Sequence, residues 1–150
     1  MTMSMTDIVL SDDRARLDVA RVHGWLAASY WSPGIERALV ERAVTGSWCL
    51  AAYREGEQVG FARAVTDRAT FAWIADVFVD PAARGAGLGR RMARWFVEHP
   101  DLAGVRRIGL VTADAHGVYA PLGFHPLRRP ENFMERLALD DAARLAGADA

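Results

Sequence analysis

The 150-residue chain contains no lysine, and all 18 of its basic residues are arginine. A Schiff-base amine and a phosphate-binding lysine of the G-x-x-x-x-G-K-[ST] type are therefore excluded. A single cysteine, Cys49, allows no disulfide within the chain and favours a reducing compartment. The four histidines (His23, His99, His116 and His125) lack the spacing of metal ligands, so we expect no bound metal.

Long apolar runs are missing as well, and no stretch approaches the roughly 18 consecutive apolar residues of a membrane-spanning helix. Asp7, Asp12 and Asp13 interrupt the region where a signal peptide would be apolar. The formal net charge of -1 gives no basic excess of the kind that binds nucleic acid. We therefore expect a cytoplasmic protein with no membrane or nucleic-acid partner.

The apolar content of 51% is sufficient for one domain over residues 1–150. Periodicity and turn signals predict helices over 11–29 and 35–45, strands over 47–53, 58–65 and 70–79, a helix from 88 that ends before Pro100, a strand over 106–112 and a short helix over 115–122. Residues 124–127 and 132–137 are two further candidate strands, and 139–150 a weak helix or tail. This order predicts an α/β fold of the layered α+β type.

The most informative segment runs from Asp76 to Arg91, where an apolar strand turns through three glycines into an amphipathic helix. Such a junction is typical of an anion site, because the first amides of a helix lack partners and point along the positive end of its dipole. A dinucleotide-binding G-x-G-x-x-G motif is absent, since Arg90 or Met92 stands where its third glycine would be.

Two short motifs carry a family resemblance. Residues 84–89 match [RQ]-x-x-G-x-[GA], and residues 119–124 match Y-x-x-x-G-F, with a predicted strand between them. In these motifs and their order, the sequence from about Trp48 to Leu137 resembles the GCN5-related N-acetyltransferase (GNAT) superfamily. The resemblance implies a mixed, mostly antiparallel central sheet, with helices on both faces and a splay between its two central strands.

The resemblance also implies that the chain binds acetyl-CoA as cosubstrate. In similar proteins the pyrophosphate lies on the loop amides, and the pantetheine arm pairs like an added strand with the backbone before the loop. The residues of this chain that the resemblance assigns to acetyl-CoA are Val77, Phe78, Val79, Arg84, Gly85, Ala86, Gly87, Leu88, Gly89 and Arg90.

By the same resemblance, the chain is expected to transfer an acetyl group to a primary amine by direct attack. Tyr119 is the candidate proton donor for the departing sulfur, because its phenol has a basicity comparable to that of a thiolate. The strand position at which many relatives carry a base falls near Trp73, so Asp76, the only carboxylate between 70 and 79, is the candidate base. The alternatives, acting through water, are Asp67, Asp114, His116 and Glu36, and the amine could also arrive already deprotonated.

The acceptor pocket is expected near the joint between the first two helices, with Tyr30, Trp31 and Trp73 as candidate walls for a small-molecule or peptide amine. No acidic cluster is evident in the sequence. Two other functions remain open, a catalytically silent acyl-CoA sensor and an enzyme acting on charged tRNA or a ribosomal protein. Homodimers are common among similar proteins, and residues 132–137 could pair with a second copy or be covered within the monomer.

Overall fold

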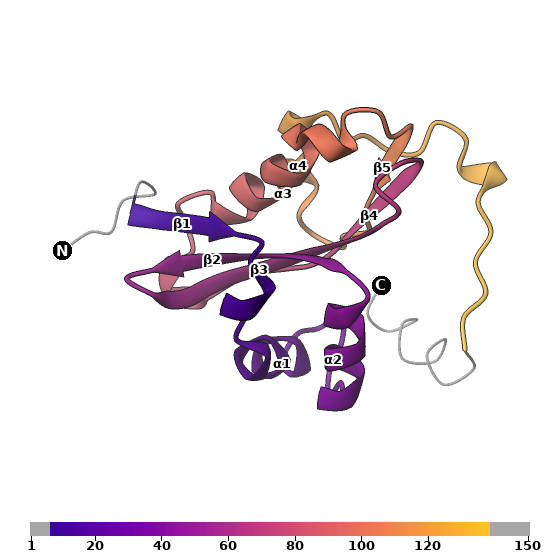
Figure 1. Ribbon diagram of the computed structural model, residues 1–150. Coiled ribbons are helices and arrows are strands. Elements are labelled where there is room, and N and C mark those ends of the chain that lie inside the picture. Colours follow the sequence, from indigo (N-terminus) through magenta and orange to yellow (C-terminus); the bar gives the residue numbers. More distant parts are fainter. Residues whose placement is uncertain (1–6, 139–150) are drawn as a thin grey trace.

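The computed structural model describes residues 7–138, which fold around a five-stranded sheet in the order β1-β2-β3-β4-β5 (Figure 1). The strands are β1 (Ile8–Ser11), β2 (Trp48–Arg54), β3 (Glu57–Thr66), β4 (Phe71–Val79) and β5 (Arg107–Gly109). Pairing is antiparallel from β1 to β4 and parallel between β4 and β5. A parallel pair needs a crossover connection, and helix α3 (Leu88–Glu98) supplies it.

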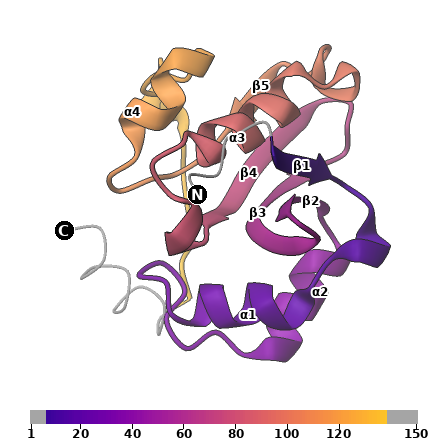
Figure 2. The same ribbon diagram turned by 90° about the vertical axis from the view of Figure 1, so that its left-hand side faces the viewer.

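Helices lie on both faces of this sheet. The pair α1 (Val19–Ala27) and α2 (Arg37–Thr45) covers one face, and α3 covers the other, with α4 (His116–Tyr119) beside it (Figures 1 and 2). The predicted fold class, a mixed and mostly antiparallel sheet between helices, is therefore confirmed.

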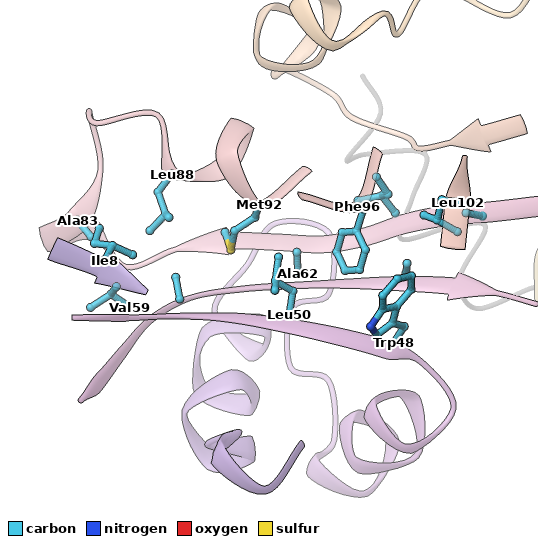
Figure 3. Close-up of a cluster of buried hydrophobic side chains, with 14 residues drawn as sticks. Ile8, Trp48, Leu50, Val59, Ala62, Ala83, Leu88, Met92, Phe96 and Leu102 are labelled. Atoms are coloured by element: carbon cyan, nitrogen blue, oxygen red, sulfur yellow. The ribbon is translucent and has the colours of Figure 1, made fainter. Parts of the chain in front are cut away.

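Each face of the sheet has its own buried cluster. Between the sheet and α3, Leu50 and Ala62 meet Met92 and Phe96, all of them fully buried (Figure 3). Phe61, next to Ala62 in β3, points to the opposite face and packs among the residues of α1 and α2. Burying each large apolar side chain of this kind stabilises the fold by about 1.5–3 kcal/mol.

The core beneath α3 leaves no room for a side chain at position 60 of β3. A Cβ added to Gly60 would lie 3.2 Å from Ala52 Cβ, 3.2 Å from Met92 Cε and 3.3 Å from Leu88 Cδ2. The glycine is therefore needed for close packing of the sheet against α3.

The predicted helix over 11–29 is wrong at its start. Ser11 is the last residue of β1, a strand that was not predicted and that pairs with β2. A 3-10 turn follows at Arg14–Arg16, and α1 runs from Val19, after its N-cap Asp18, to Ala27. The side chain of Asp18 accepts a hydrogen bond of 3.0 Å from the Arg21 amide. A four-residue edge strand exists only through its partner, and nothing in its local sequence distinguishes it from the approach to a helix.

The central predictions are confirmed within a residue or two. The strands expected over 47–53, 58–65 and 70–79 are β2, β3 and β4, and the helices expected over 35–45 and from Leu88 are α2 and α3. The hairpin between β2 and β3 turns at Glu55 and Gly56, both with positive φ (52° and 80°). This geometry is typical of a two-residue turn between antiparallel strands.

The C-terminal predictions hold less well. The strand expected over 106–112 is confined to Arg107–Gly109, and the short helix over 115–122 is α4 followed by a 3-10 turn. The strands expected over 124–127 and 132–137 are wrong, because the described chain forms no ladder there. Residues in an extended conformation become a strand only when another strand supplies hydrogen bonds. The weak helix or tail expected over 139–150 lies outside the described residues.

The expected splay between the central strands lies at β4 and β5. These strands pair only through Phe71, Ala72 and Trp73, opposite the three residues of β5. Beyond Trp73, β4 continues to Val79 beside β3 but without β5. One backbone edge of the sheet is therefore open from Ile74 onward.

Candidate active site

A cavity of about 1010 Å³ lies where β4 and β5 diverge. Its wall comes from five parts of the chain: the joint between α1 and α2, β4 from Trp73 onward, the glycine-rich loop with the first turn of α3, the segment from the end of β5 to the end of α4, and Glu135. Except for Ala86, all the residues expected to bind acetyl-CoA or form the acceptor wall line this cavity, and so do Tyr119 and Asp76. A smaller concavity of about 490 Å³ at the β2–β3 hairpin contains none of them.

Two of the three glycines in the glycine-rich loop have backbone angles that other residues rarely adopt. Gly85 and Gly87 have φ of +90° and +77°, in the left-handed region that favours glycine. Gly87 is also the N-cap of α3 and provides no side-chain hydrogen bond, so the first amides of the helix are left for another acceptor. Gly89 differs, because a Cβ there would only contact the side chains of Val77 and Val79 at 3.8 Å.

A bulge interrupts β4 beside this loop. Ala75 pairs with Arg63 and Phe78 with Phe61, so two residues of β4 face one residue of β3. The first of the two is Asp76, whose φ of +54° is uncommon for a non-glycine residue. A bulge re-aims side chains and often lies next to a functional site.

The Asp76 carboxylate is held by two partners that the sequence did not identify. Trp31 Nε1 donates to Asp76 Oδ1 at 2.9 Å, and Arg63 Nε donates to Asp76 Oδ2 at 2.7 Å. Arg63 Nη1 also donates to Ser47 Oγ at 3.0 Å. The signal available in the sequence was an arginine inside an apolar strand, since a charge placed there needs a partner of opposite sign.

Both arginines nominated for the cofactor make bonds within the protein. Arg84 Nε donates to Val79 O at 2.9 Å, and its guanidinium carbon lies 5.3 Å from the centre of the Phe78 ring. Arg90 donates at 3.2 Å to the carbonyl oxygens of Gly117 and Val118. Arg90 thus ties the first turn of α3 to α4.

Tyr119 ends α4 and is 9% exposed. Burial raises the pKa of its phenol, and the neighbouring Tyr30 and Asp114 raise that pKa further. A raised pKa keeps the phenol protonated at neutral pH, so Tyr119 can donate a proton. Its ring packs edge-on against Phe124, with 6.0 Å between the ring centres, which links the two ends of the Y-x-x-x-G-F motif.

The opposite wall of the cavity combines aromatic rings with carboxylates. The rings of Tyr30 and Trp31 stand edge to face, with centres 5.0 Å apart. Tyr30 donates a long hydrogen bond of 3.4 Å to Asp114, and Glu135 lines the same cavity. With Asp76, the structure assembles three carboxylates from distant parts of a sequence in which no acidic cluster was evident.

The other candidate bases are less well placed than Asp114. Asp67 is not among the residues that line the cavity, and it accepts hydrogen bonds from Ala69 and Thr70 in its own turn. These bonds hold the pKa of Asp67 well below its usual range. Glu36 is the N-cap residue of α2, and neither it nor His116 is among the lining residues.

The single cysteine does not belong to the site. Cys49 is buried in β2, and its thiol lies 3.6 Å from Val44 O. Burial raises the pKa of Cys49 to about 11, which leaves almost no thiolate at neutral pH. The residue is therefore a poor nucleophile for a covalent acyl intermediate.

Metal ligands and membrane spans are not found in the part of the chain that the structure describes. Across positions 7–138, no three histidine, cysteine or acidic side chains group as metal ligands. Within the same range, no helix combines the length and the apolar character needed to cross a membrane.

The acetyltransferase (GNAT) family model matches residues 10–124, which span the sheet, the glycine-rich loop and Tyr119. The chain belongs to the GNAT acetyltransferase family.

Known proteins agree with this assignment. A crystal structure of a GNAT-family protein (xcc2953) from Xanthomonas campestris pv. campestris is 42% identical, covers 87% of this chain and 93% of its own, and superposes with a TM-score of 0.84. "Putative acetyltransferase FG08082" of Gibberella zeae is 29% identical over 72% of this chain and 73% of its own length. A Clostridium acetobutylicum protein, described as a "predicted acetyltransferase with acetyl-CoA", shares the fold, with 17% identity, a TM-score of 0.64, and coverage of 89% of this chain and 96% of its own.

Proposed function

We propose that this chain transfers the acetyl group of acetyl-CoA to the primary amine of a small molecule or peptide. The observation that carries the proposal is the continuity of one cavity, which joins the N-terminus of α3, the open edge of β4 and the buried phenol of Tyr119. The family match supports acetyl transfer in general. The amine, its size and the roles of individual residues are part of the proposal.

The residues present fit a bound acyl-CoA. The backbone at Gly85 and Gly87 turns with positive φ, and the uncapped start of α3 offers amides to a diphosphate. The edge of β4 from Ile74 to Val79 faces the cavity without a neighbouring strand, so it can pair with an extended, amide-bearing arm. Acetyl-CoA would supply an activated acetyl thioester there.

The reaction exchanges a carbon–sulfur bond for a carbon–nitrogen bond, so a proton must leave the amine and another must reach the sulfur. In the proposal Tyr119 holds the second proton, because its raised pKa keeps the phenol neutral. Asp114 accepts the first, directly or through water, because it is exposed at the cavity wall and the hydrogen bond that it accepts from Tyr30 is long.

Asp76 is the base nominated from the sequence, and its contacts argue for a different task. Both of its carboxylate oxygens already accept strong hydrogen bonds, one from Trp31 and one from the Arg63 cation. Neither oxygen can therefore take a proton from the amine without giving up one of these two bonds. We assign Asp76 as a positioning residue that fixes the Trp31 ring in the acceptor wall.

The test is release of free thiol from acetyl-CoA in the presence of a panel of primary amines, combined with calorimetry of coenzyme A binding. Coenzyme A binding together with amine-dependent thiol release supports the proposal. Binding without release for any amine identifies the second candidate, an acyl-CoA sensor. If neither binding nor release is seen, both functions are excluded.

A further inference from the structure

The smaller concavity, of about 490 Å³, lies between the β2–β3 hairpin and the start of α1, and the proposed reaction does not use it. Its lining comes from the segments 16–21 and 53–58, and we call it the hairpin site. None of its lining residues belongs to the cavity at β4. Its volume is within the roughly 300–1,000 Å³ that is typical of small-molecule sites.

The lining of the hairpin site contains a buried amide with an unused hydrogen-bond donor. Gln58 is 3% exposed, and its Oε1 accepts a hydrogen bond of 2.8 Å from the Asp18 amide. This bond fixes the orientation of the side-chain amide, so Nε2 is the donor on its other side. Among residues 7–138, no acceptor lies within hydrogen-bond distance of that nitrogen. A buried donor without a partner is costly, so the amide needs an acceptor from outside the chain.

Several charged groups of the hairpin site already bind one another. Arg21 Nη2 lies 3.0 Å from Glu57 Oε1 and 3.2 Å from Asp80 Oδ2. The Asp18 carboxylate caps α1 by accepting a hydrogen bond from the Arg21 amide. These charges are therefore compensated within the protein. Arg21 Nε, however, is buried and has no acceptor in the described part of the chain, so it is a second unused donor.

One cation and one anion of the hairpin site remain without an ion-pair partner. The guanidinium carbon of Arg16 lies 4.3 Å from the centre of the Tyr53 ring, and the Tyr53 hydroxyl donates to Arg16 O at 2.8 Å. Tyr53 thus holds both the side chain and the backbone of Arg16. Glu55 is exposed at the hairpin turn. Over positions 7–138, neither Arg16 nor Glu55 takes part in an ion pair.

We propose that the hairpin site binds a small zwitterion with one carboxylate and one ammonium group, which is the chemistry of a free α-amino acid. The carboxylate accepts hydrogen bonds from the buried donors Gln58 Nε2 and Arg21 Nε and is attracted by the Arg16 cation. The ammonium group lies beside Glu55. A ligand with only an anion would leave Glu55 unpaired, and a ligand with only a cation would leave the buried amide without an acceptor.

NMR of the ¹⁵N-labelled full chain tests the proposal, with each proteinogenic L-amino acid added singly at about 10 mM. At least one amino acid should bind with a Kd of about 1 mM or tighter and shift the signal of the Gln58 side-chain amide. For that amino acid, two analogues serve as probes, one without the amino group and one with the carboxylate as its methyl ester. Each analogue should bind at least about threefold more weakly, because each loses one of the two charges.

Substitutions in the hairpin site separate the donor from the rest of the side chain. Gln58→Met and Gln58→Glu both remove the buried donor at similar side-chain size, and Gln58→Glu keeps the acceptor for the Asp18 amide. Either should weaken binding at least about 10-fold. Glu55→Gln should weaken it about threefold, because this charge is exposed. The matched control is Glu131→Gln, at another exposed glutamate outside the site, and it should leave the affinity unchanged.

Three results would overturn the proposal. The first is that no amino acid binds at about 10 mM, which would assign the Gln58 amide to a bound water molecule. The second is equal affinity for the wild type and both Gln58 variants, and the third is equal affinity for the analogue without the amino group. An amino acid that shifts only the Trp31 and Tyr119 signals binds in the acceptor cavity, which refutes the hairpin site and leaves the proposed acetyl transfer standing. Conversely, failure of the thiol-release assay does not affect this inference, because the two cavities share no residue.

Discussion

The two edges of β4 beyond Trp73 are built in opposite ways. Toward β3 the strand is paired, and Gly60, opposite Val79, is closely packed, because a Cβ there would lie 3.2–3.3 Å from three core atoms and force them to shift. Toward the cavity the strand is unpaired, and Gly85 and Gly87 are required because of their backbone angles, although a Cβ at either would meet nothing within 4 Å.

This difference separates stability from function along one strand. The β3 edge is closed by hydrogen bonds and close packing, so a change there should act on the free energy of unfolding. The cavity edge is kept open by the divergence of β5, so a change there should act on ligand binding. Asp76 belongs to both edges, because its bulge lies in the ladder while its partner Trp31 lines the cavity.

The largest expected effect comes from removing the cation that holds this bulge. Arg63→Met leaves the Asp76 carboxylate, 11% exposed, without its ion-pair partner and should lower the free energy of unfolding by about 3 kcal/mol. The double variant Arg63→Met/Asp76→Asn removes the uncompensated charge and should be less destabilised than Arg63→Met alone. Urea denaturation of the wild type, Arg63→Met, Asp76→Asn and the double variant measures this, and simple additivity of the two single effects would contradict the pairing.

The second-largest effect is expected from a substitution in the cavity at the open edge of β4. Tyr119→Phe removes the proposed proton donor, and kcat should fall about 100-fold, equivalent to about 2.7 kcal/mol, while coenzyme A affinity stays within twofold. Because the pKa of Tyr119 is raised, the wild-type activity should show no loss from this group below its ordinary pKa of 10. An unchanged kcat would assign Tyr119 a packing role only.

A substitution at Gly60 tests the edge of β4 that is paired with β3. Gly60→Ala places a methyl group 3.2–3.3 Å from three core atoms and should lower the free energy of unfolding by about 2 kcal/mol. Coenzyme A affinity, measured by calorimetry on the folded protein, should change little. A large loss of affinity at unchanged stability would refute the separation of the two edges.

The smallest effect is expected in the glycine-rich loop. Gly87→Ala forces an L side chain to φ near +77°, at about 1 kcal/mol, and should weaken coenzyme A binding several-fold if the strain shifts the loop. Gly104→Ala is the control, since a Cβ there meets nothing within 4 Å and no positive φ is required. Equal effects of the two substitutions would show that the loop geometry does not matter.

The sequence predicted the elements whose signals are local. The alternation in β2, β3 and β4 and the amphipathic stripe of α3 each span enough residues to define a period, and the structure confirms them. The glycine-rich loop can be recognised in the sequence because positions with positive φ and positions at a helix start favour particular residue types. Residue type alone does not identify every such position, because the third glycine of the loop, Gly89, has room for a Cβ.

The predictions that failed concern residues whose state depends on a distant partner. β1 was not predicted, because the strand character of these four residues depends on their pairing with β2. The pattern over 132–137 predicts a strand, although the described chain offers these residues no ladder. The partners of Asp76 come from the α1–α2 joint and from β3, far from it in sequence.

Periods and motifs within a few residues were enough to predict the order of the central elements, the glycine-rich turn before α3 and the motif that contains Tyr119. Only the tertiary structure decided that β4 has one open edge, that Asp76 is paired with Arg63, and that Asp114 and Glu135 share a cavity with Trp31. The reason is that hydrogen bonds, ion pairs and cavity walls join groups that the chain separates, and only packing brings them together.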